Sequence, residues 1–234
     1  MTRTIVAFGA HPDDIEIGCG GALLQALANG HKAINVVMTS GEAGSDRIPP
    51  GQLAPLREKE AGQAAALLGI GDVHFLGFPD GLTGYTRDMR LQVMTLIREL
   101  RPDLIFIHAS GEDPGDHRIC HELVVSAARS AAGPWFQETG HPPHGVSCIL
   151  GYEVWQPLKI PGLIVGIDQV IDRKTAAIRA HQSQCKDTRY DEAARGLARY
   201  RGIMSLGADH AEAFEIIQLQ DIHPAAIFEP GKKA

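Results

Sequence analysis

Short apolar runs alternate with segments of helical periodicity along the first half of the chain. Four of these runs are rich in β-branched or aromatic residues and predict buried strands, at Thr4–Phe8, Ile34–Met38, Val73–Leu76 and Leu104–Ile107. Apolar residues spaced three or four apart predict the intervening helices, at Ala22–Ala28, Leu56–Leu68, Leu91–Leu100 and His117–Ala132. Strands that alternate with helices in this way indicate an α/β protein with a mostly parallel sheet flanked by helices.

The second half of the chain is less regular and predicts fewer elements. We expect strands near Ser147–Trp155 and at Leu163–Ile167, and helices at Asp168–His181 and around Asp191–Gly202. The remaining C-terminal residues predict a loose tail. No run of Pro, Ser or charge is long enough to act as a linker, so the sequence predicts a single domain over residues 1–234.

Composition and charge exclude several classes of protein. Hydrophobic residues make up 44% of the chain and charged residues 21%, which is typical of a globular protein and excludes intrinsic disorder. The net charge is −6 and Lys and Arg are nowhere concentrated, which argues against a nucleic-acid partner. The longest apolar runs are far shorter than the roughly 20 residues that cross a bilayer, and the N-terminus lacks the pattern of a cleaved signal, so we expect a cytoplasmic protein with no membrane partner. Four widely spaced cysteines predict free thiols rather than a disulfide framework.

A histidine and two carboxylates follow the first predicted strand directly, in the turn Ala10-His11-Pro12-Asp13-Asp14. Sheets of this kind bind ligands at the carboxyl ends of their strands. His11 and Asp14 can both reach one metal ion, which leaves Asp13 beside it to hold a water molecule. Zinc accepts such mixed ligands, and a catalytic zinc keeps one position for water. Taken alone, the turn is equally typical of aspartates that cap the following helix.

A second acidic and histidine-containing cluster follows the strand predicted at Leu104–Ile107. It reads Asp113-Pro114-Gly115-Asp116-His117-Arg118. His117 is the candidate third ligand, Asp116 is placed to orient a ligand imidazole, and His121 lies one helical turn further along the same face. One such histidine is more often a surface or capping residue. Two clusters at matching ends of parallel strands favour a metal site of two histidines and one carboxylate.

Three glycines follow the first cluster closely, at Gly18, Gly20 and Gly21. Their spacing lacks the full Gly-x-Gly-x-x-Gly pattern of a dinucleotide-binding loop. We expect them to allow a helix to pack closely on a strand.

The sequence resembles the PIG-L/LmbE-like metal-dependent deacetylases. The hallmark of that family, Ala-His-Pro-Asp-Asp-Glu, matches Ala10–Asp14 with Ile15 in the final place, and its second motif, His-Pro-Asp-His, matches residues 114–117. Further matching stretches cover nearly the whole chain: Leu56–Ala61, Phe78–Gly81, Tyr152–Trp155, His181–Gln184 and Ala211–Phe214.

The resemblance implies a Rossmann-like fold and a zinc ion held by the positions that match His11, Asp14 and His117. Histidine and carboxylate ligands also suit Fe²⁺, so the native metal stays open. The resemblance further implies that Asp13 is the general base and that Arg57 contacts the substrate. Family members remove acetyl groups from N-acetylglucosamine units, which makes a small amino sugar or its conjugate the expected substrate. Members often form trimers or hexamers, which implies a homo-oligomer.

Two positions are less clearly assigned by the resemblance. His181 is either a residue that approaches the site from the second half or a structural histidine of the core. Pro114 replaces a histidine that usually acts as an electrostatic or acid partner of the reacting carbonyl, and a proline side chain cannot donate a proton. Either a neighbour takes that role, or zinc and Asp13 act alone, or the reaction differs; the available neighbours are His108, Glu112, Asp113 and His121.

The function expected from these observations is a zinc-dependent hydrolase that removes an N-acetyl group from an N-acetylglucosamine-type sugar. One alternative is a metal-dependent enzyme of the same scaffold with another reaction, such as hydration or hydrolysis of a non-sugar amide, for which Pro114 is the argument. Another is a non-catalytic metal- or sugar-binding protein. The free carboxylate of Asp13 argues against a pure binding site, and the fold alone does not decide among the three.

Overall fold

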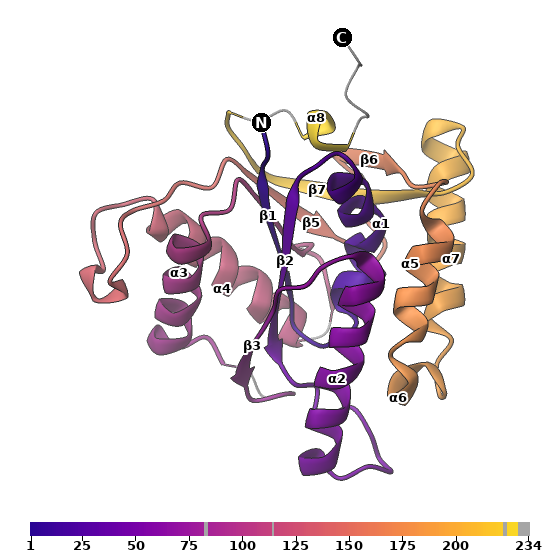
Figure 1. Cartoon of the computed structure of the whole chain (residues 1–234), viewed down its shortest axis with the longest axis horizontal. Coiled ribbons are helices and arrows are strands. Elements are labelled where there is room, and N and C mark those ends of the chain that lie inside the picture. The colour runs from indigo at the N-terminus through magenta and orange to yellow at the C-terminus, as the bar shows by residue number, and fades with distance from the viewer. Residues whose placement is uncertain (82–83, 114, 222–223, 229–234) are drawn as a thin grey trace.

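The structure is a computed structural model that describes residues 1–81, 84–113, 115–221 and 224–228, and these residues form one seven-stranded sheet with helices on both faces (Figure 1). The strand order is β3-β2-β1-β4-β5-β7-β6. Five neighbouring strands are parallel: β1 (Thr4–Gly9), β2 (Lys32–Thr39), β3 (Val73–Phe78), β4 (Leu104–His108) and β5 (Cys148–Tyr152). β7 (Ala211–Leu219) lies between β5 and β6 (Leu163–Gly166) and runs antiparallel to both. The predicted mostly parallel α/β fold is confirmed.

The helices divide between the two faces of the sheet, as Figure 1 shows. One face is covered by α3 (Arg87–Leu100) and α4 (Gly115–Ala131). The other carries α1 (Asp14–Ala28), α2 (Pro50–Leu68), α5 (Ile171–Arg179), α7 (Tyr190–Arg201) and the short helices α6 (Gln182–Cys185) and α8 (Ala225–Phe228). Two further short helical segments lie at Gln137–Thr139 and Gly202–Leu206. Among the described helices, none is both long and apolar enough to cross a membrane.

Each face of the sheet has its own hydrophobic core. In β1, Ile5 and Ala7 pack on the side of α1 and α2, whereas Val6 and Phe8 pack on the side of α3 and α4. Successive strand residues point to opposite faces, so a strand covered on both sides is apolar throughout. This double burial explains why the first-half strands are recognisable as continuous apolar runs.

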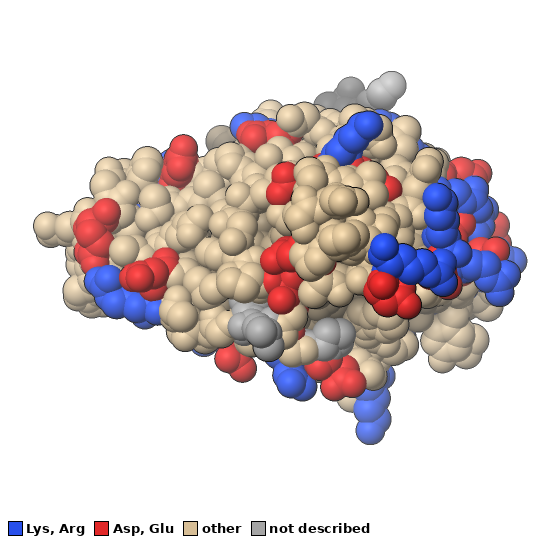
Figure 2. All heavy atoms as spheres, turned by 90° about the horizontal axis from the view of Figure 1, so that it is seen from below, with Lys and Arg blue, Asp and Glu red and all other residues tan. Residues whose placement is uncertain are grey.

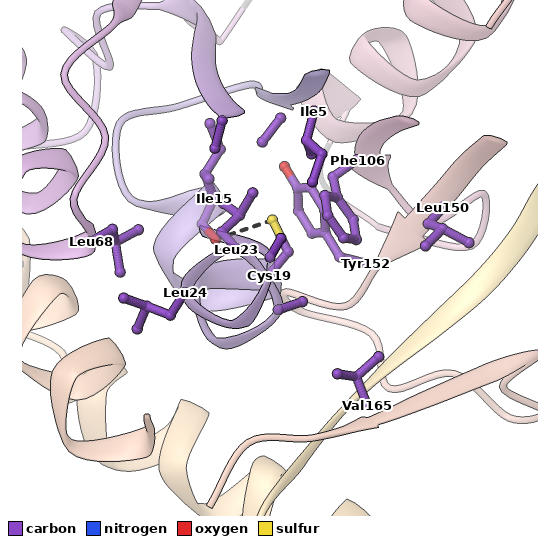
Figure 3. Close-up of a cluster of buried hydrophobic side chains, with 14 of the residues drawn as sticks. Ile5, Ile15, Cys19, Leu23, Leu24, Leu68, Phe106, Leu150, Tyr152 and Val165 are labelled. Atoms are coloured by element: carbon purple, nitrogen blue, oxygen red, sulfur yellow. Dashed lines mark hydrogen bonds between the residues drawn. The ribbon is translucent and has the colours of Figure 1, made fainter. Parts of the chain in front are cut away.

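Two of the three glycines of α1, Gly18 and Gly21, bring this helix close to the sheet as predicted, whereas a Cβ atom on Gly20 would meet Lys174 and Leu68 at ordinary contact distances. A Cβ atom on Gly18 would lie 2.1 Å from Cδ2 of Tyr152, and one on Gly21 would lie 2.7 Å from Cγ2 of Ile167. Figure 3 shows the ring of Tyr152 against α1, beside Cys19. The Tyr152 hydroxyl donates a hydrogen bond to the Phe8 carbonyl at 2.6 Å, so the ring cannot move away easily. The four cysteines are free thiols, as expected.

Replacing Gly18 with alanine is expected to lower the free energy of unfolding by about 1–3 kcal/mol, because the added methyl group overpacks the contact with Tyr152. Gly62 is the matched control, since it lies exposed on α2 and a Cβ atom added there would have no neighbouring atom within 4 Å. Gly62→Ala should leave stability unchanged or raise it by up to about 1 kcal/mol. Urea denaturation measures both values, and equal effects would contradict the packing argument.

Two sequence predictions about the fold are wrong. The helix expected at Ala22–Ala28 begins at Asp14, because packing on the sheet overrides the low helix propensity of the glycines. The expected loose tail contains β7, whose apolar pattern is interrupted by Glu212 and Glu215. In the structure Glu212 forms an ion pair with Lys174 at 2.6 Å, and Glu215 accepts hydrogen bonds from Ser110.

Candidate active site

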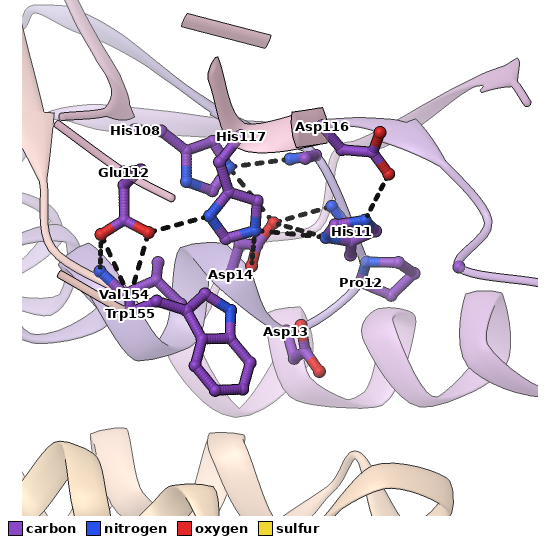
Figure 4. Close-up of polar contacts among 12 residues, drawn as sticks. His11, Pro12, Asp13, Asp14, His108, Glu112, Asp116, His117, Val154 and Trp155 are labelled. Carbon is purple, nitrogen blue, oxygen red and sulfur yellow. Dashed lines mark hydrogen bonds and ion pairs between the residues drawn. The ribbon is translucent and has the colours of Figure 1, made fainter. Parts of the chain in front are cut away.

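Three side chains from two separate sequence motifs converge where β1 and β4 end (Figure 4). β1 and β4 are parallel neighbours, so the turn after β1 and the start of α4 meet at the same edge of the sheet. His117 Nε2 lies 3.3 Å from Asp14 Oδ1 and 3.3 Å from His11 Nδ1. His11 Nδ1 lies 3.4 Å from Asp14 Oδ2. The structure thus places all three candidate metal ligands around one point.

The spacing of these donor atoms fits a zinc ion. Ligand atoms at zinc distances of about 2.0–2.1 Å lie about 3.3–3.4 Å apart when the coordination is tetrahedral. The two imidazole nitrogens lie 3.3 Å apart, and each faces a different oxygen of the Asp14 carboxylate, His117 at 3.3 Å and His11 at 3.4 Å. Two imidazoles and one carboxylate also form a donor set that zinc accepts at catalytic sites. Fe²⁺ accepts the same donors, so the donor set suits either ion.

His117 is held by acidic groups on both of its nitrogen atoms. Glu112 Oε2 lies 3.0 Å from Nδ1, while Asp14 lies beside Nε2. Burial opposes protonation, but Asp14 and Glu112 outweigh it and raise the pKa of His117 to about 9. Burial likewise opposes ionisation of Asp14, yet the neighbouring imidazoles of His117 and His108 hold the pKa of that carboxyl well below its usual range. The carboxylates of Asp14 and Glu112 therefore favour a positive charge at this point, and a bound cation would supply one.

Glu112 also fixes the loop that follows β5. Its carboxylate accepts backbone hydrogen bonds from Val154 at 2.8 Å and from Trp155 and Gln156 at 3.1 Å. A carboxylate that accepts the Nδ1 hydrogen of a ligand histidine sets the tautomer and directs Nε2 toward the metal. Glu112 therefore orients His117, a role that the sequence did not indicate.

His11 is oriented in the same way from the opposite side. Its Nε2 atom lies 3.1 Å from Asp80 Oδ1 and 3.1 Å from Asp116 Oδ2. Burial lowers the pKa of His11, but the hydrogen bonds with Asp116, Asp14 and Asp80 outweigh burial and hold it well above its usual range. Asp116 thus contacts a ligand imidazole, and Asp80, from the matching stretch Phe78–Gly81, contacts the same nitrogen.

Asp13 stands beside the three candidate ligands with a strained backbone. Its φ is +121°, a conformation that residues other than glycine rarely adopt and that tends to mark functional sites. The side chain makes no capping hydrogen bond to α1, so it does not act as the helix cap that the turn alone suggested. Burial raises the pKa of the Asp13 carboxyl against the opposing charge of Arg57. A buried carboxylate of this kind, which does not cap the helix, is suited to accept a proton.

Arg57 holds Asp13 in place. Its Nη2 atom donates to Asp13 Oδ2 at 3.2 Å and to the Pro12 carbonyl at 2.7 Å, and its Nη1 atom donates to the Gly41 carbonyl at 3.0 Å. The residue is only 3% exposed, yet it also lines the cavity above the site. Arg57 therefore contacts both the strained turn and the space that a ligand would occupy.

A cavity of about 390 Å³ opens over these groups. Its described walls include Asp13, Asp80 and Asp116 together with Trp155, Gln184 and Tyr190. Figure 2 views the molecule from this end and shows red acidic side chains near the middle of the face, with blue basic side chains gathered at the right. The volume suits a small ligand such as a sugar unit.

Comparison with known proteins decides the family. The family model named PIG-L, with the description GlcNAc-PI de-N-acetylase, matches residues 6–128. This chain belongs to the PIG-L family. The match contains both motifs that supply His11, Asp13, Asp14 and His117.

Several known proteins match over most of the chain. The diacetylchitobiose deacetylase of Thermococcus kodakarensis is 28% identical over 227 residues, which cover 92% of this chain and 83% of that enzyme. A conserved protein of known structure from Thermus thermophilus is 32% identical over 100% of both chains, with a TM-score of 0.82. The 4-carboxy-2-hydroxymuconate hydratase GalB from Pseudomonas putida gives a TM-score of 0.84 at 21% identity, over 95% of this chain and 99% of that chain. The last likeness concerns the fold alone.

His108 and His121 stabilise the backbone around the turn that carries His11 and Asp14. His108 Nε2 accepts a hydrogen bond from the Ala10 backbone at 3.0 Å, and burial with the nearby charge of His117 lowers the pKa of His108 to about 4. His121 Nδ1 lies 2.8 Å from the His108 carbonyl oxygen. Neither side chain is among the described residues that line the cavity. Both histidines therefore brace the backbone that carries the ligands.

The remaining candidates from the sequence have different placements. His181 is buried, with Nε2 3.4 Å from Glu16 Oε2, and it lies outside the described cavity wall. Asp113 is exposed near Arg118. Pro114, where the PIG-L pattern has a histidine, lies outside the described residues. Tyr190 and Gln184 line the cavity, and no sequence motif pointed to them individually as site residues.

Proposed function

We propose that this PIG-L family member is a zinc-dependent hydrolase that removes the N-acetyl group from an N-acetylglucosamine-type amino sugar or its conjugate. One observation carries the proposal: the carboxylate of Asp13 stands beside the converging donors of His11, Asp14 and His117, and His11, Asp13 and Asp14 line one cavity. The family description and the diacetylchitobiose deacetylase relative, both named for removal of acetyl groups from amino sugars, support the substrate class.

His11, Asp14 and His117 would hold the zinc ion. When bound, zinc supplies a Lewis acid that polarises the acetamide carbonyl and makes water more acidic. Asp13 takes a proton from the attacking water as its oxygen forms a bond to the acetamide carbon. The protonated Asp13 then returns this proton to the sugar nitrogen as the carbon–nitrogen bond breaks. The products are acetate and the free amino sugar.

Arg57 contributes by orientation. Its guanidinium fixes the Asp13 carboxylate through Nη2 and remains anchored on two backbone carbonyls. A base held in this way needs no reorganisation when the substrate arrives. The Asp13 side chain does not cap α1, and its backbone has a strained conformation of the kind that clusters at functional sites. Both features support a catalytic role rather than a site that only binds a metal or a sugar.

Acetate release from a panel of N-acetylglucosamine derivatives tests the proposal. The panel contains the free sugar, phosphorylated and nucleotide-linked forms, and conjugates with other aglycones. Zinc-loaded protein is expected to release acetate from at least one member, and protein stripped with a chelator should regain activity when zinc returns. A zinc-loaded protein that releases acetate from none of them would contradict the proposal.

Glu112→Gln is expected to weaken zinc binding about 10- to 100-fold, because the amide lacks the charge that orients and polarises His117. Competition against a fluorescent zinc chelator measures the change. Glu122→Gln is the matched control, since Glu122 is exposed on α4, the helix that carries His117. An unchanged zinc affinity in Glu112→Gln would show that the carboxylate serves only to fix the loop after β5.

A further inference from the structure

A second cavity adjoins the candidate active site. It has a volume of about 300 Å³ and lies between α1, α7, β7 and the loop after β5. Four residues line both cavities: Ile17, Val154, Trp155 and Tyr190. The two cavities are therefore neighbours that have part of their walls in common. We call the second space the apolar cavity.

The walls of the apolar cavity are mostly small aliphatic side chains. Helix α7 contributes Ala194, Leu197 and Ala198, and β7 contributes Ala211 and Ala213. The active-site cavity, in contrast, presents several carboxylates and an arginine. Of the two neighbouring cavities, one is thus polar and lies at the candidate metal ligands, and the other is apolar and lies beside α7.

The charged groups of the apolar cavity are already paired with each other. Lys174 Nζ lies 2.6 Å from Glu212 Oε1, and Glu212 also accepts backbone hydrogen bonds from α1. Glu153 is paired with the guanidinium of Arg201. Buried charges that are neutralised in this way do not require a charged ligand. The occupant that fits these walls is therefore uncharged and apolar.

Two aromatic rings stand where the cavities meet. Trp155 and Tyr190 form an edge-to-face pair with centroids 5.9 Å apart. Trp155 is held through its backbone N–H by Glu112, the same carboxylate that orients His117. A ring in this position can contact a sugar on one side and an apolar substituent on the other.

We propose that the apolar cavity binds an uncharged alkyl or aryl aglycone of the same substrate whose acetamido sugar occupies the active-site cavity. This inference rests on the proposed function and extends it to the substrate class: conjugates with an apolar aglycone are preferred over the free sugar. Its basis is the wall that the two cavities share, which includes Trp155 and Tyr190, and the internal pairing of the charges in the apolar cavity.

Binding of a homologous ligand series tests the inference without turnover. Zinc-loaded Asp13→Asn protein is titrated by calorimetry with N-acetylglucosamine and its methyl, butyl and hexyl β-glycosides. Each buried methylene is expected to tighten binding about fourfold until the cavity is filled. Equal affinities for the methyl and hexyl glycosides would overturn the inference. The comparison uses a protein whose apolar cavity carries no substitution.

A cavity-filling variant locates the effect. Ala194→Leu, placed in the same background, should remove the gain from the longer chains and leave the affinity for N-acetylglucosamine unchanged. Ala66→Leu is the matched control, because Ala66 is exposed on α2. A gain that persists in Ala194→Leu protein with a normal melting temperature would place the alkyl chain elsewhere and overturn the inference.

The results also separate this inference from the proposed function. Acetate release without any gain from the alkyl chain would overturn the apolar subsite alone. A gain from the alkyl chain that Ala194→Leu removes, without acetate release from the wild-type chain, would overturn deacetylation alone. Failure of every glycoside to bind, together with no acetate release from any member of the panel, would overturn both.

Discussion

Asp13→Asn is expected to lower kcat for acetate release by about 10²–10⁴, the contribution typical of a general acid or base, while zinc stays bound. The amide has nearly the shape of the carboxylate but cannot accept the proton of the attacking water. Asn also tolerates positive φ better than most residues, so the turn should keep its conformation. Arg57 should keep its place beside the substituted side chain, because its hydrogen bonds to the carbonyls of Pro12 and Gly41 do not involve the Asp13 side chain.

Two measurements on the same preparation check this expectation. Zinc content by atomic absorption should match the wild type, and acetate release should fall. Asp88→Asn is the control, since Asp88 is exposed at the start of α3, and its activity should be unchanged. Retained turnover in Asp13→Asn would reject Asp13 as the base. Loss of zinc together with activity would instead assign Asp13 to metal retention.

The position of the site could be predicted because parallel strands end at one edge of the sheet. His11 and Asp14 follow β1 directly, and His117 follows β4 after a short connection, so neighbouring strands carry them together. The sequence could not show that β1 and β4 are neighbours, since strand order depends on packing across the whole domain. It was the recurrence of histidine and aspartate after two strands that signalled a shared site.

The outer partners of the ligands were harder to predict. Glu112 and Asp80 each lie close to a recognised motif, but their roles depend on which ligand nitrogen they face. Tyr190 comes from the start of α7, and its place in the cavity wall depends on how α7 packs against α5 and β7. No local periodicity reports such contacts between distant segments. A carboxylate next to a ligand motif is the signal that could have identified Glu112.

The C-terminal half shows the same limit in the fold. β7 was missed because Glu212 and Glu215 break its apolar pattern, and strand propensity assumes that buried charges are rare. The structure resolves this conflict by pairing Glu212 with Lys174 of α5. That pair also borders the apolar cavity, so the feature that concealed the strand is part of what shapes the pocket.

His117→Ala is expected to abolish acetate release and to weaken zinc binding strongly. The loss of affinity should exceed the factor of about 10 to 100 that is typical when a residue that only orients a ligand is replaced. The imidazole supplies one of three donor atoms, and its removal leaves Asp14 and Glu112 facing each other across an unfilled space. His121→Ala is the matched control on the same helix, one turn further along. Among the described residues, the one hydrogen-bond partner of the His121 side chain is the His108 carbonyl. This variant should therefore bind zinc normally, and its free energy of unfolding should fall by about 0.5–1.5 kcal/mol.

Equilibrium dialysis against zinc and thermal denaturation of both variants distinguish a ligand from a structural histidine. If His117→Ala is too unstable to purify, His11→Ala provides the same test from the other strand, since His11 is partly exposed and easier to replace. Loss of zinc in both His117→Ala and His11→Ala, with retention in His121→Ala, would assign the ion to the point where β1 and β4 end. Equal zinc retention in all three variants would reject that assignment, because donors 3.3–3.4 Å apart cannot be removed singly without weakening a site that they share.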